Sequence, residues 1–477
     1  MAVASALFLL LVFFRGTVFI FPFTSGSNGV FFDEAQRVLA GEVMYRDFFE
    51  FVGPGNPYLN ALVLRFTGPH IAALGLLAVA LGTASALLVH HLAASVVPGR
   101  WRLLAPAAFA VLVFAPYTFG DHKWPALLCG LGGLATLASG PASRARAMAA
   151  GALLGTGLLF TQDLGAGLFA GTFVFVLLRE RRLALPFVAA FVVPPLLGFG
   201  FFVARAGLER VFYDGLLFPL THYRDLNRFA LTARPTWRTL PREAAQVVLA
   251  VAGVLGALAA LWRERRAPPD TARLLALAGL GMLLATGHRG LYPMGLAVQT
   301  AVLIPLALRT LLSGAGRGRV AARGLLALVA LGVAHGLFGF VVWRQLMQPM
   351  VKEVHRAGTV WTARAMPELT WIESQTAPGE AAFLLPARGG HYFLTRTRDV
   401  TGFPYLIEGQ STPEQARAAL GQIRAARPRV GLWDQRPWPR GTTESDGPLA
   451  FLFQELHVHY DFERLPSGVF LLRRKQP

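Results

Sequence analysis

Long apolar runs alternate with short polar connections through the first 344 residues of the chain. The runs lie at about residues 2–23, 71–96, 103–119, 125–139, 147–161, 164–178, 183–204, 244–262, 274–286, 291–312 and 324–343. A membrane-spanning helix needs roughly 20 mainly apolar residues, so the pattern predicts about eleven transmembrane helices. The expected fold class is an all-α polytopic membrane domain.

Basic residues gather in every second connection between these runs. The clusters are Arg100/Arg102, Arg144/Arg146, Arg179/Arg181/Arg182, Arg263/Arg265/Arg266/Arg273 and Arg317/Arg319/Arg323. Cytoplasmic loops carry the excess of arginine and lysine, which places the N-terminus in the cytoplasm. An odd number of helices then places the C-terminus outside, as in a multi-pass protein of the bacterial inner (plasma) membrane.

The composition becomes that of a soluble domain from about residue 345. A helical approach over 351–375 is expected to lead into strands at 381–386, 392–395, 429–434 and 468–473, with helices at 413–426 and 447–457. Strands that alternate with helices predict a small α/β domain. We therefore divide the chain into a membrane domain, 1–344, and a C-terminal periplasmic or extracellular α/β domain, 345–477.

Overall composition agrees with a membrane protein and excludes other classes. The chain is 54% hydrophobic and 15% charged, with a mean hydropathy of +0.47, which is too apolar for an ordinary soluble protein. A net charge of +18 could suggest nucleic acid, but the basic residues lie in clusters between apolar runs, so no nucleic-acid partner is expected. The single cysteine, Cys129, excludes an internal disulfide and argues against a thiolate metal site.

Besides the first outer loop, two places bring polar residues to the outer side of the predicted membrane domain. Between Arg146 and Arg179 lie 32 residues, which suits a hairpin of two short helices better than two full crossings of about 20 residues each. The tip of that hairpin, Thr161–Asp163, would lie below the outer surface, as would Gly287–Gly290. Polar groups at such depth need a protein or water-filled cavity.

The first outer loop, residues 24–70, contains the most distinctive motif of the chain. Its segment 29–58 reads GVFFDEAQRVLAGEVMYRDFFEFVGPGNPY and contains the adjacent acids Asp33 and Glu34. The acidic pair and the later Gly-x-x-x-Tyr-x-Asp-Phe segment at 41–48 resemble polytopic GT-C class glycosyltransferases, the superfamily of protein mannosyltransferases and lipid A aminoarabinose transferases. The resemblance implies transfer of a sugar from a polyprenyl-phosphate donor to a lipid, glycan or protein acceptor at the outer membrane face.

The chemistry implied by that resemblance requires a base and fixed positive charge. An acceptor hydroxyl that attacks the anomeric carbon needs a carboxylate, and one aspartate suffices for inversion; Asp33 is the candidate, with Glu34 beside it. A departing phosphate is suited to arginine. The candidate substrate and phosphate contacts are Arg46, Asp47, Asp121, His122, Lys123, Asp163, His288 and Arg289. The sequence points to no particular cofactor, and a divalent metal stays open because some members of the superfamily use one.

Structural interpretations compete with each assignment. Asp33 and Gln36 have the spacing of a capping box, and Gly41 could close the short helix that follows. Glu50 is expected to face water, and Asp121–Lys123 could be a polar cap beside an interfacial tryptophan. Two other functions also remain open: a transporter or flippase of lipid-linked sugars, and a non-catalytic envelope assembly protein.

Overall fold

The computed structural model describes most of the chain. The described residues are 27–115, 120–222, 240–263, 270–286, 293–313, 318–339 and 349–476, without 363, 387, 405, 407–410 and 435–447. The apolar run predicted at 2–23 and the loop that carries His288 and Arg289 therefore lie outside the described residues.

Helices occupy the apolar runs of the membrane domain. They are α3 (Gly55–Thr67), α4 (Ile71–Ala94), α5 (Leu104–Ala108) with the π-helix η2 (Phe109–Phe114), α6 (Lys123–Ala138), α7 (Arg144–Phe160), α8 (Gln162–Arg179), α9 (Ala184–Ala206), α12 (Leu240–Arg263), α13 (Thr271–Thr286), α14 (Pro293–Leu312) and α15 (Gly318–Leu337). Within the described residues, five helical segments are long and apolar enough to cross a bilayer. The protein is thus a multi-pass membrane protein, while the count of eleven remains a prediction.

Small residues let the helices of the predicted hairpin approach their neighbours closely. A Cβ atom on Gly151 or Gly155 of α7 would lie 2.2 or 2.1 Å from a backbone oxygen of α9. Gly171 of α8 has a similar contact with α13. Membrane helices associate mainly by such close packing, because burial away from lipid gives no hydrophobic gain. The helical hairpin predicted between Arg146 and Arg179 is confirmed, with Thr161 at its turn.

The C-terminal region is an α/β domain, as predicted. It contains α16 (Pro367–Gln375), β3 (Ala381–Leu385), α17 (Gly389–Thr395), β4 (Arg398–Asp399), α18 (Pro413–Ala426), β5 (Val430–Asp434), α19 (Pro448–His459), β6 (Tyr460–Arg464) and β7 (Val469–Arg474). The strand order is β4-β3-β5-β7-β6. Strand β3 pairs in parallel with β4 and β5, whereas β7 pairs antiparallel with β5 and β6.

Two predicted segments of this domain have a different structure, and strands β4 and β6 are absent from the prediction. Residues 351–362 form an antiparallel hairpin, β1 (Val351–His355) and β2 (Gly358–Thr362), and not the start of a helix. Gly358, with φ +117°, makes the turn that a helix would lack. The segment 392–395, expected as a strand, ends helix α17, where Phe393 and Leu394 pack into a core shared with other helices. Here tertiary packing overrides the apolar, β-like sequence.

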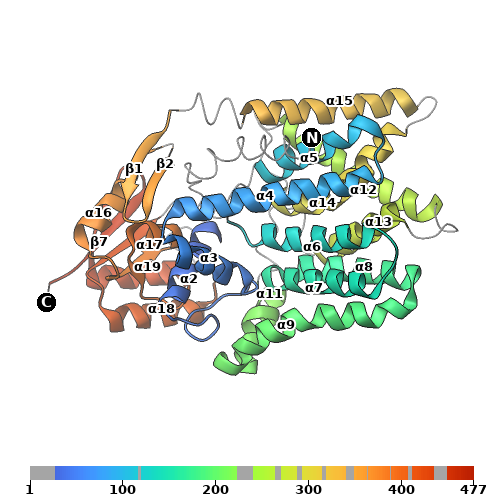
Figure 1. The fold of residues 1–477 in the computed structure, drawn as a ribbon. Coiled ribbons are helices and arrows are strands. Elements are labelled where there is room, and N and C mark those ends of the chain that lie inside the picture. Colours follow the sequence, from blue (N-terminus) through green and yellow to red (C-terminus); the bar gives the residue numbers. More distant parts are fainter. Residues whose placement is uncertain are drawn as a thin grey trace.

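Helix α2 (Ser27–Leu39) lies between the two parts of the molecule (Figure 1). In Figure 1 the α/β domain caps one end of the helical bundle, and α2 and α3 fill the space between. One apolar core joins Phe32 of α2 and Leu74 of α4 to Val360 and Phe393 of the α/β domain. The backbone N–H of Ile71 donates to the carbonyl of Ala357 at 3.0 Å. The α/β domain is therefore packed directly on the first loop and on the end of α4.

Candidate functional site

Asp33 lies in the middle of α2 and is buried, with 2% of its surface exposed. The helix begins at Ser27, six residues earlier, so the interpretation of Asp33 as a helix cap is wrong. Arg37, one turn later on the same face, donates from Nε to Asp33 Oδ2 at 3.1 Å. Gly41, with φ +92°, follows the end of the helix, as expected for a closing glycine.

Arg37 joins this acid to a second acid from the C-terminal domain. Its Nη2 atom lies 2.6 Å from Asp399 Oδ2 and donates to the carbonyl of Thr401 at 2.5 Å, while Nη1 donates to Glu42 Oε2 at 3.2 Å. Burial raises the pKa of Asp33 to about 7, against the opposing effect of Arg37, and the negative charges of Asp399 and Glu42 add to the increase. A carboxyl group with a pKa near neutrality can accept a proton under physiological conditions.

A second group of buried acids lies near Asp33 and consists of Glu34, Glu50 and Asp214. Glu34 and Glu50 are fully buried, so the expectation that Glu50 faces water is wrong. Glu50 Oε1 accepts from the backbone N–H groups of Phe51 and Val52, both at 2.8 Å. Burial, and then the neighbouring Glu50, raise the pKa of Glu34 well above its ordinary value. Burial likewise raises the pKa of Asp214, in the π-helix η5 (Tyr213–Leu217), to about 7.

Asp121, His122 and Lys123 form a buried polar group at the start of α6. Lys123 Nζ lies 3.1 Å from Asp121 Oδ1 and 3.2 Å from His122 Nε2. Burial opposes ionisation of Asp121, but the charge of Lys123 and the hydrogen bond from the Lys123 backbone N–H outweigh it and hold the pKa of Asp121 below its ordinary value. The His122 ring packs edge-on against the ring of Phe31 on α2, with 5.4 Å between the ring centroids. The structure therefore brings these three candidates against the helix that carries Asp33.

The turn between α7 and α8 reaches the same region. His122 Nδ1 lies 2.7 Å from the Thr161 hydroxyl oxygen. The Gln162 amide donates to the carbonyls of Phe51 at 3.2 Å and Gly215 at 3.1 Å. Asp163 is half-buried and accepts from the backbone N–H of Leu164 at 2.8 Å. The turn thus contacts the start of α6 through Thr161 and the first loop through Gln162.

Arg46 and Asp47 lie apart from the buried acids. Arg46 Nη2 donates to Asp47 Oδ2 at 2.7 Å, and the side chain of Arg46 is 43% exposed. Asp47 Oδ2 also accepts from the backbone N–H of Val43 at 2.6 Å, which closes a turn. The structure leaves this pair on the surface of the first loop, where it could meet an approaching substrate but cannot contact Asp33.

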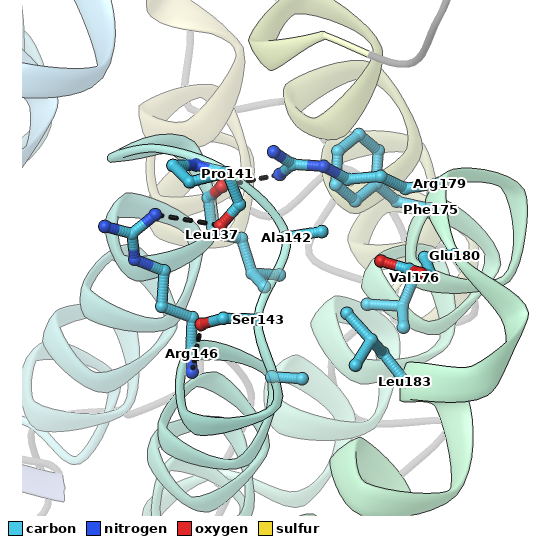
Figure 2. A pocket seen from close by; sticks show the side chains of 11 residues that line it. Leu137, Pro141, Ala142, Ser143, Arg146, Phe175, Val176, Arg179, Glu180 and Leu183 are labelled. Carbon is cyan, nitrogen blue, oxygen red and sulfur yellow. Dashed lines mark hydrogen bonds between the residues drawn. The ribbon is translucent and has the colours of Figure 1, made fainter.

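The basic connections lie at the other end of the bundle. Helix α6 begins at Lys123, beside the buried acids, and ends at Ala138 near a pocket lined by Arg146 and Arg179 (Figure 2). Arg179 donates to the carbonyls of Leu137 and Gly140, and Arg146 donates to that of Pro141. These guanidinium groups are used to hold the loop between α6 and α7. The candidate site residues at the start of α6 and the basic loop at its end thus lie at opposite ends of the helical bundle, as the charge pattern predicts.

Side chains that could ligate a metal ion can be compared in the part of the chain that the structure describes. No group of three or more His, Cys, Asp or Glu side chains there is arranged to hold an ion. The candidates His288 and Arg289 fall outside the described residues, so their assignment stays a prediction.

Several residues of this site escaped the sequence analysis. Arg37 could have been found, because Asp33 and Arg37 have the i, i+4 spacing of an ion pair on one helix. Asp214 and Asp399 carry no local signal: each meets the first loop only through the tertiary fold.

Solved structures with the same overall arrangement include three membrane proteins. ArnT from Cupriavidus metallidurans bound to undecaprenyl phosphate superimposes with a TM-score of 0.61 at 13% identity, over 98% of this chain and 97% of that one. The archaeal oligosaccharyltransferase AglB from Archaeoglobus fulgidus, in complex with an inhibitory peptide and a dolichol-phosphate, gives 0.52 at 12% identity, over 100% and 74%. The chain has the GT-C fold of membrane glycosyltransferases.

The arabinofuranosyltransferase AftD from Mycobacteria shares this GT-C fold, with a TM-score of 0.52 at 15% identity, over 100% of this chain and 41% of that one. No family model and no curated protein matches the sequence. The fold expected from the first-loop motif is therefore confirmed.

Proposed function

We propose that the protein is a polyprenyl-phosphate-dependent glycosyltransferase that transfers a sugar to a lipid, glycan or protein acceptor at the outer face of a bacterial inner membrane. The observation that carries this proposal is Asp33, a buried acid with a pKa of about 7 in the first loop of a GT-C fold. In this orientation the N-terminus is cytoplasmic and the α/β domain is periplasmic or extracellular.

Asp33 is the proposed base. The ionised carboxylate takes the proton of the acceptor hydroxyl while the hydroxyl oxygen bonds to the anomeric carbon of the donor sugar. The bond between that carbon and the phosphate oxygen breaks on the opposite side, and the electron pair leaves with the polyprenyl phosphate. One displacement of this kind inverts the anomeric configuration. Burial and the neighbouring Glu50 raise the pKa of Glu34 well above its ordinary value, which favours its uncharged form beside the proposed base.

Lys123 is the proposed contact for the leaving phosphate among the described residues. Its side chain is 16% exposed, and its ammonium group is held by Asp121 and by His122, whose ring packs against Phe31 of α2. A fixed cation of this kind stabilises charge that develops on the leaving group. Arg289 and His288 are proposed to contribute to the same phosphate site, and Arg46 and Asp47 to meet the donor or acceptor at the surface.

Two further facts support a lipid-linked donor. ArnT is bound to undecaprenyl phosphate and AglB to a dolichol-phosphate, and both compounds are polyprenyl phosphates. In this chain the candidate site lies at one end of an apolar bundle, where a phosphate can stay in water while its tail enters lipid.

The test is a transfer assay with the full chain in lipid nanodiscs. A panel of polyprenyl-phosphate sugars is incubated with lipid, glycan and peptide acceptors, and mass spectrometry detects released polyprenyl phosphate and glycosylated product. Release coupled to product, with an inverted anomeric centre by NMR, supports the proposal. Movement of intact lipid-linked sugar across proteoliposomes without cleavage would replace it with a transporter. If the protein shows neither sugar transfer nor transport, the result favours a non-catalytic assembly protein.

A further inference from the structure

One segment of the C-terminal domain, Asp399–Phe403, lies against the first loop. Asp399 Oδ2 and the Thr401 carbonyl both contact Nη2 of Arg37, at 2.6 and 2.5 Å. The backbone N–H of Phe49 donates to the carbonyl of Gly402 at 2.7 Å. A domain that is remote in sequence therefore contacts the charged partner of Asp33.

Asp399 is held in place independently of Arg37. It directly follows Arg398 in β4, and its Oδ1 atom accepts from the Thr401 N–H at 2.8 Å and from the Thr401 hydroxyl at 3.0 Å. The next residue, Gly402, donates to the Gln422 side chain of α18 at 2.8 Å. The Asp399 carboxylate is thus a fixed feature of the α/β domain.

The guanidinium group of Arg37 is shared between acids on different elements. Nε serves Asp33 on α2, Nη2 serves Asp399 on β4, and Nη1 serves Glu42 in the first loop. The planar fork of arginine allows these contacts at the same time. Asp33 consequently receives only part of the stabilisation that one arginine could give a buried carboxylate.

We propose that Asp399 is a positioning residue of the active site, through which the C-terminal domain holds Arg37 and keeps Asp33 basic enough to act. This inference rests on the proposed function of Asp33 as the base. The α/β domain then has a role in the chemistry itself, because without the Asp399 charge Arg37 is shared among fewer acids and can interact more strongly with Asp33.

The charges around Asp33 determine in which direction its pKa moves when the charge of Asp399 is removed. Arg37 and Glu34 lie on α2, Glu42 follows it, Asp399 comes from β4, and the Tyr392 phenol of α17 is near enough to sense the charge of Asp33. Loss of the Asp399 charge removes a negative neighbour and frees Arg37. Both changes favour the ionised carboxylate, so the pKa of Asp33 falls.

The test compares Asp399→Asn with Asp399→Glu in the full chain. Infrared spectra of protein labelled with ¹³C-aspartate follow the protonated carboxyl band against pH, with Asp33→Asn to assign it. For Asp399→Asn we expect the midpoint to fall by about one pH unit, the size of effect typical of a nearby unit charge. The midpoint of the acidic limb in the pH dependence of the transfer rate should move down by the same amount. Asp399→Glu keeps the negative charge and should leave the midpoint close to that of the wild type. Asp461→Asn, exposed on β6 of the same domain, is the matched control.

The outcomes separate this inference from the proposed function. An unchanged infrared midpoint in folded Asp399→Asn overturns the positioning role, even where the transfer rate falls. A shifted midpoint in a protein that transfers no sugar leaves the positioning of Asp33 intact and overturns the proposed function. If Asp399→Asn does not fold, Glu42→Gln removes another acid from the same guanidinium at a partly exposed position. An unchanged midpoint in that variant also overturns the shared-arginine inference.

Discussion

His122 Nδ1 lies 2.7 Å from the hydroxyl oxygen of Thr161, and this contact joins the start of α6 to the turn between α7 and α8. The same hydroxyl donates to the backbone carbonyl of His122 at 3.2 Å. Nδ1 is therefore the donor to Thr161, which leaves Nε2 as the acceptor that faces Lys123 Nζ at 3.2 Å. The hairpin turn thereby sets the orientation of the proposed phosphate contact.

Thr161→Val should weaken both the fold and the donor site. Valine keeps the side-chain shape but leaves His122 with a buried, unsatisfied N–H, which costs about 1–3 kcal/mol of unfolding free energy. The misplaced Lys123 should raise KM for the donor more than it lowers kcat. Thermal unfolding and steady-state kinetics measure the two effects. Thr156→Val is the control, because that hydroxyl bonds only within its own helix, to Ala152.

Asp33→Asn should abolish most sugar transfer without loss of the fold. Asparagine can still accept a hydrogen bond from Arg37 but cannot take a proton from the acceptor, so we expect a fall of about a hundredfold to ten-thousandfold in kcat. Release of polyprenyl phosphate measures the rate, and gel filtration in detergent checks the fold. Retention of near wild-type turnover in a folded Asp33→Asn protein would contradict the catalytic assignment.

Much of the architecture could be predicted because it follows from local pattern. Apolar length placed α4, α6, α9 and α12, and the charge clusters separated the basic end of the bundle from the end with the candidate site. The hairpin of α7 and α8 followed from the 32 residues between Arg146 and Arg179. In each case a few neighbouring residues carry the information.

The interior of the site could not be predicted, because its contacts are long-range. The pair of Asp33 and Gln36 has the spacing of a helix cap, and only the start of α2 at Ser27 shows that Asp33 is in the helix interior. The sequence analysis expects Glu50 in water, yet the fold buries it beside Glu34. Asp399 reaches Arg37 across more than 360 residues of sequence.

Glu34→Gln should make stability less dependent on pH. The raised pKa means that native Glu34 keeps its proton while the unfolded carboxyl, with its ordinary value of 4.5, loses it. The contribution of Glu34 to the unfolding free energy of the wild type is therefore full below about pH 4.5. It declines as the pH rises towards the folded pKa, by up to about 1.4 kcal/mol per pH unit. Glutamine carries no such proton and matches the neutral form.

The measurement for Glu34→Gln is the difference in Tm from wild type between pH 5 and pH 8. We expect the variant to gain on the wild type as the pH rises. Asp33, Glu50 and Asp214 remain in both proteins, so the difference reports Glu34 together with its coupling to Glu50 and Asp33. Glu463→Gln, exposed on β6, controls for the loss of one carboxyl group. A constant difference across the range would mean that Glu34 is ionised in the native protein.

Gly389→Ala should separate the α/β domain from α2. A Cβ atom at Gly389 would lie 2.5 Å from the Gly29 carbonyl oxygen and from the Val30 Cα, and backbone atoms cannot move aside cheaply. The displaced α17 should weaken the contact of Asp399 with Arg37 and loosen α2, which hydrogen exchange followed by mass spectrometry measures as faster exchange in α2.

The matched control for Gly389→Ala is Gly421→Ala, in helix α18 of the same domain. No atom lies within 4 Å of a Cβ built at Gly421, so alanine there should stabilise the helix by about 0.5–1 kcal/mol through backbone entropy alone. Gly421→Ala should therefore raise Tm with no change in α2 exchange or in transfer rate. If Gly389→Ala behaves in the same way, the α/β domain does not hold α2, because a close backbone contact between them would then be dispensable.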